Sequence, residues 1–199
     1  MGLLVSLLWL AAALGIARLS AGAAAQALAA VLAAVAGTTL PDLDLLLGLG
    51  HRSGLTHSPL PLLLAGFAGR GWRGVSAGLA LGIGLHLAAD CFPNAMRGYA
   101  TVKLPAAGSI GAGASYLWLA IGALLLTGAG AVLLAAALPT RWALAAAVAI
   151  AMVGAGYLFA TDGGWPALCV YGAFGWLAVR RQGLRSPGSG ATVGGNGMP

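Results

Sequence analysis

Long apolar runs, separated by short polar connections, are the feature of this sequence that most constrains its fold. We count seven runs, which cover residues 3–16, 23–35, 59–68, 75–89, 114–138, 142–160 and 166–179. A helix that crosses a bilayer needs about 20 residues, with a range of about 17–25. The fifth and sixth runs reach this length, and all the others except the third approach it with their flanks. The sequence therefore predicts an all-α, polytopic membrane helical bundle of about six to seven spans.

The third run is short and contains two prolines, so it is either a thin crossing or a re-entrant half-helix. In the fourth run, Gly78 and Gly82 form a small-x-x-x-small pair, which allows close contact between helices. We predict a single transmembrane helical domain over 1–182, with the motifs for a functional site within 40–92. A flexible C-terminal tail over 183–199, rich in glycine and serine, is expected to follow it.

Composition excludes two broad classes of protein. Hydrophobic residues make up 60% of the chain and charged residues only 7%, whereas a soluble domain carries roughly 25% charged residues. A chain this apolar is neither a soluble single-domain enzyme nor a disordered protein. The net charge of +6 arises mainly from arginines between the apolar runs. Such residues set membrane topology, so we expect membrane lipids as partners and no nucleic acid.

Nearly all the acidic and imidazole side chains lie in one short part of the chain. Six of the seven fall between positions 42 and 90: Asp42, Asp44, His51, His57, His86 and Asp90. The seventh, Asp162, has the sequence context of an ordinary turn. Ionisable groups near or inside a bilayer are costly, so they are candidates for function.

The six residues form three groups that suit divalent metal ions. Two carboxylates lie two residues apart, two imidazoles share a polar loop, and His86 and Asp90 share one helix face at i and i+4. Each group taken alone also has a structural explanation. The paired carboxylates could cap a helix, the loop histidines could lie at the membrane interface, and His86 and Asp90 could form a structural hydrogen-bonded pair. Together they favour a joint site. Imidazole and carboxylate ligands suit Zn²⁺ first, with Mn²⁺ possible, as one or two ions.

Topology gives an independent expectation. The three groups lie on one face of the membrane if the third and fourth runs both cross it. The opposite face then carries seven cations, and the site face carries three. The seven are Arg18, Arg70, Arg73, Arg141, Arg180, Arg181 and Arg185, and the three are Arg52, Arg97 and Lys103. The positive-inside rule predicts an integral membrane protein whose site faces the extracytoplasmic side.

Three segments of this chain resemble a known family. They are Leu-Pro-Asp-Leu-Asp at 40–44, His-Arg-Ser-Gly-Leu-Thr-His-Ser at 51–58 and His-Leu-Ala-Ala-Asp at 86–90. They resemble the YdjM-like family of inner-membrane, metal-dependent hydrolases, with its P-D-x-D, H-R-x-x-T-H-S and H-x-x-x-D segments in this order. The resemblance covers about residues 35–105. This chain has one extra residue before Thr56 and lacks the first-span histidine often found in the family. The resemblance implies hydrolase activity and a bacterial inner-membrane location.

We therefore expect a membrane-embedded hydrolase that cleaves an ester or phosphoester of an amphiphilic, lipid-like substrate through a metal-activated water. The expected metal ligands are Asp42, Asp44, His57, His86 and Asp90. Asp44 also counts as catalytic, with His51 as a ligand or general base and Arg52 as a phosphate contact. Ser53, Thr56 and Ser58 are expected to orient ligands. One alternative is a proton- or cation-coupled transporter that uses the same cluster. Another is a scaffold with a structural metal.

Overall fold

A computed structural model describes residues 3–60, 63 and 69–185 of the chain. Seven α-helices lie within these residues: α1 (Leu3–Leu19), α2 (Ala23–Gly37), α3 (Leu43–Leu46), α5 (Arg73–Asp90), α6 (Ala112–Ala137), α7 (Thr140–Ala160) and α8 (Gly164–Arg185). Short 3-10 turns cover Leu40–Asp42 (η1), Arg70–Trp72 (η2) and Gly98–Ala100 (η3). The predicted all-α class is confirmed. The one addition is a small antiparallel hairpin of β1 (Lys103–Leu104) and β2 (Gly108–Ser109).

The chain divides into two compact units, residues 1–168 and 169–199. The first unit contains the helical bundle, and the second contains α8 from Cys169 onward. Most of the predicted third run, 59–68, and positions 186–199 of the predicted tail lie outside the described residues. Residues 183–185 belong to α8.

Only some of the helices have the length and composition of a membrane span. Among the described residues, α6 and α7 qualify. Helices α2 and α3 qualify together as one broken span, with a bend of 48° between them. By these criteria, the structure supports two or three candidate spans, fewer than the six to seven predicted. Part of the difference arises because α1 has 17 residues, which is short for a crossing, and because most of the third predicted run lies outside the described residues.

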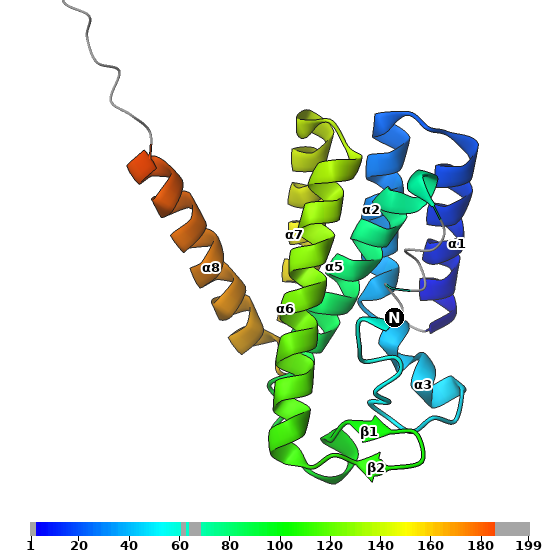
Figure 1. Cartoon of the computed structure of the whole chain (residues 1–199), viewed down its shortest axis with the longest axis vertical. Coiled ribbons are helices and arrows are strands. Elements are labelled where there is room, and N and C mark those ends of the chain that lie inside the picture. The colour runs from blue at the N-terminus through cyan, green and yellow to red at the C-terminus, as the bar shows by residue number, and fades with distance from the viewer. Residues whose placement is uncertain (1–2, 61–62, 64–68, 186–199) are drawn as a thin grey trace, which may run out of the picture. The chain divides into compact units, whose positions relative to one another are not determined.

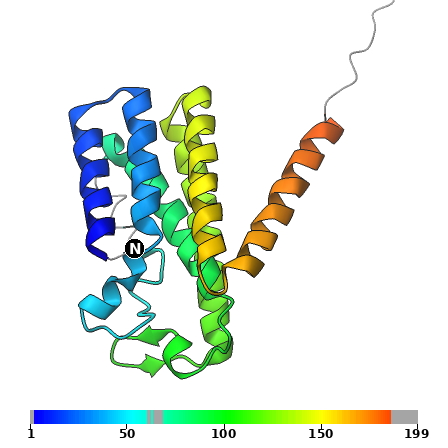
Figure 2. The same cartoon turned by 180° about the vertical axis from the view of Figure 1, so that it is seen from behind.

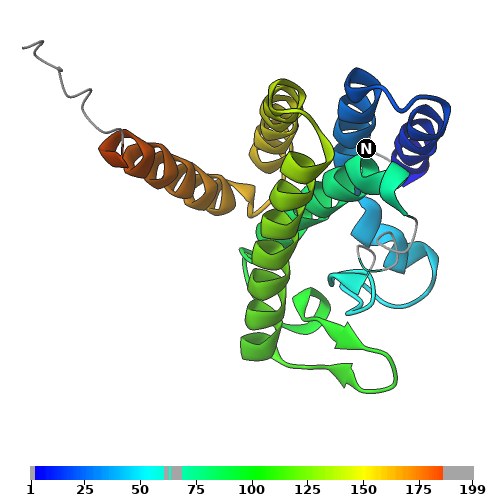
Figure 3. The same cartoon turned by 45° about the horizontal axis from the view of Figure 1, so that its top comes forward.

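Helix α5 lies at the centre of the bundle and packs against α2 and α6. Helix α2 also packs against α1 and α7 (Figure 1). The connections α1–α2 and α6–α7 lie at one end of the bundle, and the hairpin lies at the other (Figures 1 and 2). Gly74 and Gly82 of α5 approach Gln26 and Ala34 of α2 in the same order, so the two helices run in the same sense. Both end on the hairpin side (Figure 1). Figure 3 shows α5 between α6 and the pair of α1 and α2. The polar segments after α2 and at the end of α5 are thereby brought together.

A ladder of glycines lets α2 and α5 approach closely. A Cβ atom at Gly78 would overlap the carbonyl oxygen of Ala30, and one at Gly82 would overlap that of Ala34. A Cβ atom at Gly74 would lie 2.9 Å from the carbonyl oxygen of Gln26. Both series advance by four residues, which follows one ridge of an α-helix. The predicted small-residue contact therefore continues for three rungs.

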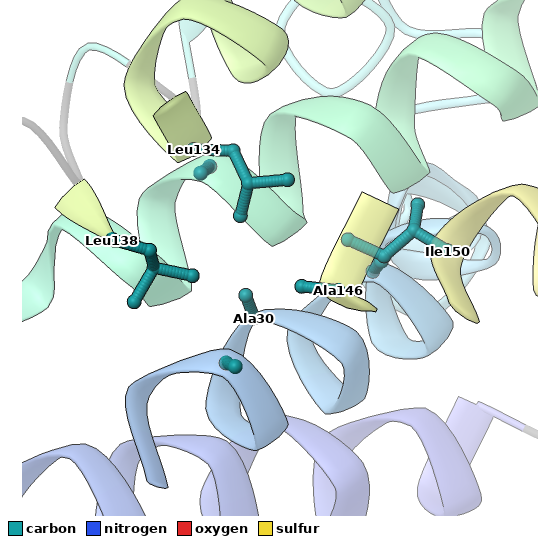
Figure 4. Packing of buried hydrophobic residues seen from close by; sticks show 8 residues of the cluster. Ala30, Leu134, Leu138, Ala146 and Ile150 are labelled. Carbon is teal, nitrogen blue, oxygen red and sulfur yellow. The ribbon is translucent and has the colours of Figure 1, made fainter. Parts of the chain in front are cut away.

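The core between α2, α6 and α7 uses small residues on one helix and branched ones on its neighbours. Figure 4 shows Ala30 of α2 facing Leu134 and Leu138 at the end of α6, with Ala146 and Ile150 of α7 beside them. All five are buried. Burying a leucine or isoleucine side chain contributes about 1.5–3 kcal/mol when the reference is water. Close packing also gains dispersion energy where the surroundings are apolar.

Candidate metal centre

His86 continues the ladder between α2 and α5. It lies four residues after Gly82, and its Nδ1 is 2.8 Å from the carbonyl oxygen of Thr38, four residues after Ala34. A carbonyl oxygen only accepts hydrogen bonds, so Nδ1 carries the proton. In the neutral imidazole, Nε2 then holds a lone pair. The end of α2 thus fixes both the position and the tautomer of His86.

His57 is held in the same way by a different segment. Its side chain is fully buried, and its Nδ1 lies 3.1 Å from Oγ1 of Thr56 and 3.3 Å from Oδ2 of Asp44. The buried Asp44 carboxylate accepts a 2.9 Å hydrogen bond from the backbone N–H of Ser53. A carboxylate beside Nδ1 is the arrangement that commonly orients a metal-binding histidine so that Nε2 faces the metal. Trp118 of α6 donates a 2.7 Å hydrogen bond to the His57 carbonyl oxygen.

The two Nε2 atoms face one another at 3.3 Å. Two lone pairs at this distance repel each other unless a proton or a metal ion lies between them. A tetrahedral zinc ion, with bonds of about 2.0–2.1 Å to nitrogen, holds its ligand atoms about 3.3 Å apart. Asp42 completes the group with Oδ1 at 3.8 Å from the Nε2 atom of His86. The ligand atoms of Asp42, His57 and His86 all lie within 4.8 Å of one another, so this group could hold a metal ion.

Asp90 adds a second carboxylate beside the histidines. Its Oδ2 lies 3.3 Å from Nε2 of His57 and 3.5 Å from Nε2 of His86. This oxygen is buried, and no described residue donates a hydrogen bond to it. The other oxygen, Oδ1, pairs with Nη2 of Arg52 at 2.8 Å. The free oxygen therefore points to the space that the two imidazoles share.

Arg52 is a buried structural partner of this site. Its Nη1 donates a 2.6 Å hydrogen bond to the carbonyl oxygen of Ala100, and its side chain is only 8% exposed. The guanidinium is thus engaged by Asp90 and by the backbone of Ala100, and its contact with a substrate phosphate stays a prediction. The backbone at Arg52 adopts a left-handed conformation with φ of 57°, which is uncommon for a non-glycine residue.

The hairpin holds the histidine loop in place. The backbone N–H of Gly54 donates to the carbonyl oxygen of Lys103 at 2.8 Å, and the N–H of Lys103 donates to that of Arg52 at 3.0 Å. The Lys103 ammonium donates to the carbonyl oxygens of His51, Tyr99 and Thr101 at 2.8–2.9 Å. A Cβ atom at Gly54 would lie 2.7 Å from the terminal Cδ2 of Leu104, so a larger residue here would have to displace that side chain.

The remaining predicted residues lie around the ligand group. His51 stacks on the Tyr99 ring, with centroids 4.2 Å apart, and lies outside the group of Asp42, His57 and His86. Burial lowers the pKa of His51, so its imidazole is neutral at pH 7. Among the predicted orienting hydroxyls, Thr56 reaches His57. The hydroxyls of Ser53 and Ser58 instead form local turn contacts, with Leu55 N–H and with the Leu55 carbonyl oxygen respectively.

Three contacts of the site had no clear sequence signal. Tyr157, in the last turn of α7, places its hydroxyl 3.1 Å from Nδ1 of His86. A tyrosine near a helix end usually suggests an interfacial aromatic residue, so its sequence position does not indicate this role. Thr38 acts through its backbone carbonyl and Trp118 through a contact 61 residues away in sequence. Neither leaves a spacing pattern.

Comparison of the chain with known protein families, with curated proteins and with solved structures found no match. The assignment of function therefore depends on the geometry of this centre.

Asp44 is expected to act on metal affinity without binding the metal. Replacing Asp44 with asparagine removes the charge beside Nδ1 of His57 and should weaken metal binding by about 10–100-fold. Titration against a metal-competing chelator measures this change. Ser58→Ala is the matched control because its hydroxyl contacts only the local backbone, and it should leave the affinity unchanged. Equal affinities for Asp44→Asn and the wild type would contradict the assigned role.

Proposed function

We propose that this protein is a membrane-embedded, metal-dependent hydrolase that acts on an ester or phosphoester of a lipid-like substrate. The observation that carries the proposal is the pair of Nε2 atoms 3.3 Å apart, with carboxylate oxygens of Asp42 and Asp90 beside them. Two nitrogen and two carboxylate donors without a thiolate favour Zn²⁺, with Mn²⁺ as an alternative. Cys91 lies next to Asp90, but burial raises the pKa of its thiol to about 11, which disfavours thiolate ligation.

The ligand assignment follows from the contacts. His57, His86 and Asp42 would hold the metal, and Asp90 would serve as a fourth ligand or as a proton acceptor through Oδ2. A divalent ion held by these residues would supply a Lewis acid and would lower the pKa of a bound water to about 7. Asp42 is the most open of the four, with 39% of its side chain exposed, whereas the side chains of His57 and His86 are buried. Substrate therefore approaches from the side of Asp42.

The surrounding residues keep the donors in the correct state. The Thr38 carbonyl retains a proton on Nδ1 of His86, and the Asp44 carboxylate orients His57 through its Nδ1. Arg52 binds one oxygen of Asp90 and leaves the other free to accept a proton from the attacking water. General-base catalysis requires such a group within hydrogen-bond distance of the attacking water. In this assignment, Arg52 positions Asp90.

The hydrolase proposal is tested by metal analysis joined to a substrate screen. Wild-type protein loaded with Zn²⁺ or Mn²⁺ should hydrolyse a member of a panel of alkyl esters, phosphomonoesters and phosphodiesters. The double variant Asp42→Asn, His86→Ala should lose both the metal and the activity. A folded wild type that binds no metal after reconstitution, or that hydrolyses nothing at full occupancy, would overturn the proposal.

We also propose an integral membrane location with the site on the extracytoplasmic side, in the bacterial inner membrane. Arg18, in the last turn of α1, and Arg141, in the first turn of α7, flank the two connections that lie at the end opposite the hairpin (Figure 1). The site end carries Arg52, Arg97 and Lys103. A reporter fused after Arg185 should behave as cytoplasmic, and one inserted at Ala106 in the hairpin turn as extracytoplasmic. The reverse pattern would contradict this orientation.

One observation favours a transporter as the second candidate. Helix α2 and the segment Leu40–Leu46 form a candidate broken span with a bend of 48°, and Asp42 lies just after the break, in η1. Transporters bind ions at such interrupted helices. Metal-dependent ion flux in liposomes, without hydrolysis of any substrate, would favour this reading. The position of the site at the ends of α2 and α5 favours the hydrolase.

A further inference from the structure

A pocket of about 530 Å³ opens beside the candidate metal centre. It is lined by Leu3 at the start of α1, Thr39 and Asp42 between α2 and α3, and Leu45 and Leu46 at α3. Its volume lies within the range of about 300–1,000 Å³ that is typical of small-molecule sites. One wall of the pocket, Asp42, is also a member of the candidate ligand group. The pocket and the metal centre are therefore contiguous.

The lining specifies the chemistry of the occupant. Three of the five residues are leucines, and no lysine or arginine is among the lining residues that the structure describes. The Thr39 hydroxyl is paired with that of Ser6. The polar end of the pocket is consequently the carboxylate of Asp42, which is also a candidate metal ligand. An alkyl chain would pack against the leucines of the pocket. The polar group at the end of that chain would then lie near Asp42 and the candidate metal centre.

The surface beside the pocket is apolar as well. Leu45, Leu46 and Leu47 are 53%, 70% and 61% exposed. An exposed apolar patch next to a polar cluster is typical of a segment that meets a lipid surface. The chain of an amphiphile in the outer part of a bilayer can reach the pocket from this patch without crossing water.

We propose that this pocket binds the alkyl or acyl chain of the substrate and places the bond to be hydrolysed at Asp42. The inference rests on the proposed hydrolase function and names the substrate class, a single-chain or double-chain amphiphile with its ester next to the chain. Hydrolysis breaks the bond to the leaving oxygen. Water supplies the hydroxyl to the carbonyl carbon or phosphorus atom and a proton to the leaving group.

The test uses a photoreactive alkyl phosphate carrying a diazirine, with the metal-loaded protein in nanodiscs of phosphatidylcholine. Peptides that contain Leu3 or Leu45 should be labelled, and dodecyl phosphate should suppress the labelling in a saturable manner. Leu46→Trp, which fills the pocket, should raise the half-suppressing concentration by about tenfold or more, as expected for a blocked apolar subsite. Leu124→Trp is the control, because Leu124 lies on the exposed face of α6 and outside the pocket.

The outcomes separate this proposal from the proposed function. Labelling of these peptides that dodecyl phosphate does not suppress, or equal effects of the two tryptophan variants, would overturn the pocket assignment while metal binding stands. Saturable labelling in a protein that binds no metal would support the pocket and contradict the hydrolase. The metal content of Leu46→Trp must equal that of the wild type, because a loss would show that the variant disturbs the site itself.

Discussion

Replacing His86 with alanine should remove stoichiometric metal binding and weaken the affinity at least about 100-fold. Loss of a group that only orients a ligand costs about 10–100-fold, and His86 contributes a donor atom itself. Its Nε2 lies within 4 Å of His57, Asp42 and Asp90, so its removal opens the centre of the group. Plasma mass spectrometry of the purified protein measures the bound metal, and chelator competition measures the affinity.

His51→Ala is the matched control for this prediction. His51 is also a histidine of the polar loop, but it stacks on Tyr99 and lies outside the ligand group. Its removal should leave the metal content unchanged. Equal metal loss in the two variants, or full metal content in His86→Ala, would contradict the assignment of the centre.

The second large effect is expected from a single methyl group between α2 and α5. Gly78→Ala should lower the free energy of unfolding by about 1–3 kcal/mol, because the new Cβ overlaps the carbonyl oxygen of Ala30 and no side chain can move aside. The helix propensity of alanine, up to about 1 kcal/mol better than that of glycine, opposes this loss. Thermal unfolding in detergent measures the balance.

Gly128→Ala in α6 gives the comparison. No described atom lies within 4 Å of a Cβ built at Gly128. Only the higher helix propensity of alanine then acts, so the free energy of unfolding should rise by about 0.5–1 kcal/mol. If both alanine variants change the melting temperature in the same direction, the close contact of α2 with α5 is not what stabilises the bundle.

Much of the helical architecture was predictable from the sequence, but the number of helices long and apolar enough to span a membrane was not. The runs that gave α6 and α7 are long and uniformly apolar, so their helices follow directly from length and composition. Helix α2 ends at Gly37, before the polar segment that begins at Thr38. The hairpin had no signal, because strands of two residues, such as Lys103–Leu104, show no periodicity.

The residues of the candidate site were identifiable by type, but their roles were not. Charged and imidazole groups are rare in this chain, so their concentration within 42–90 was visible. A loop does not fix side-chain direction, and neither the order nor the spacing separates His57 from His51 or Asp42 from Asp44. The structure separates them by the atoms they face: Asp44 faces Nδ1 of His57, and Asp42 lies near Nε2 of His86.

The ladder between α2 and α5 has a consequence for how this centre can change. Successive rungs pair residues 48 positions apart, and the rung after Gly82 is the bond from His86 to Thr38. Four residues further along each segment lie Asp42 and Asp90, which are again 48 positions apart. One residue inserted into either helix turns everything beyond it by about 100°, which would carry the donors on that helix away from those on the other. The centre depends on the relative rotation of α2 and α5 about their axes. Substitutions can therefore change the strength of metal binding, whereas insertions and deletions within either helix should abolish it.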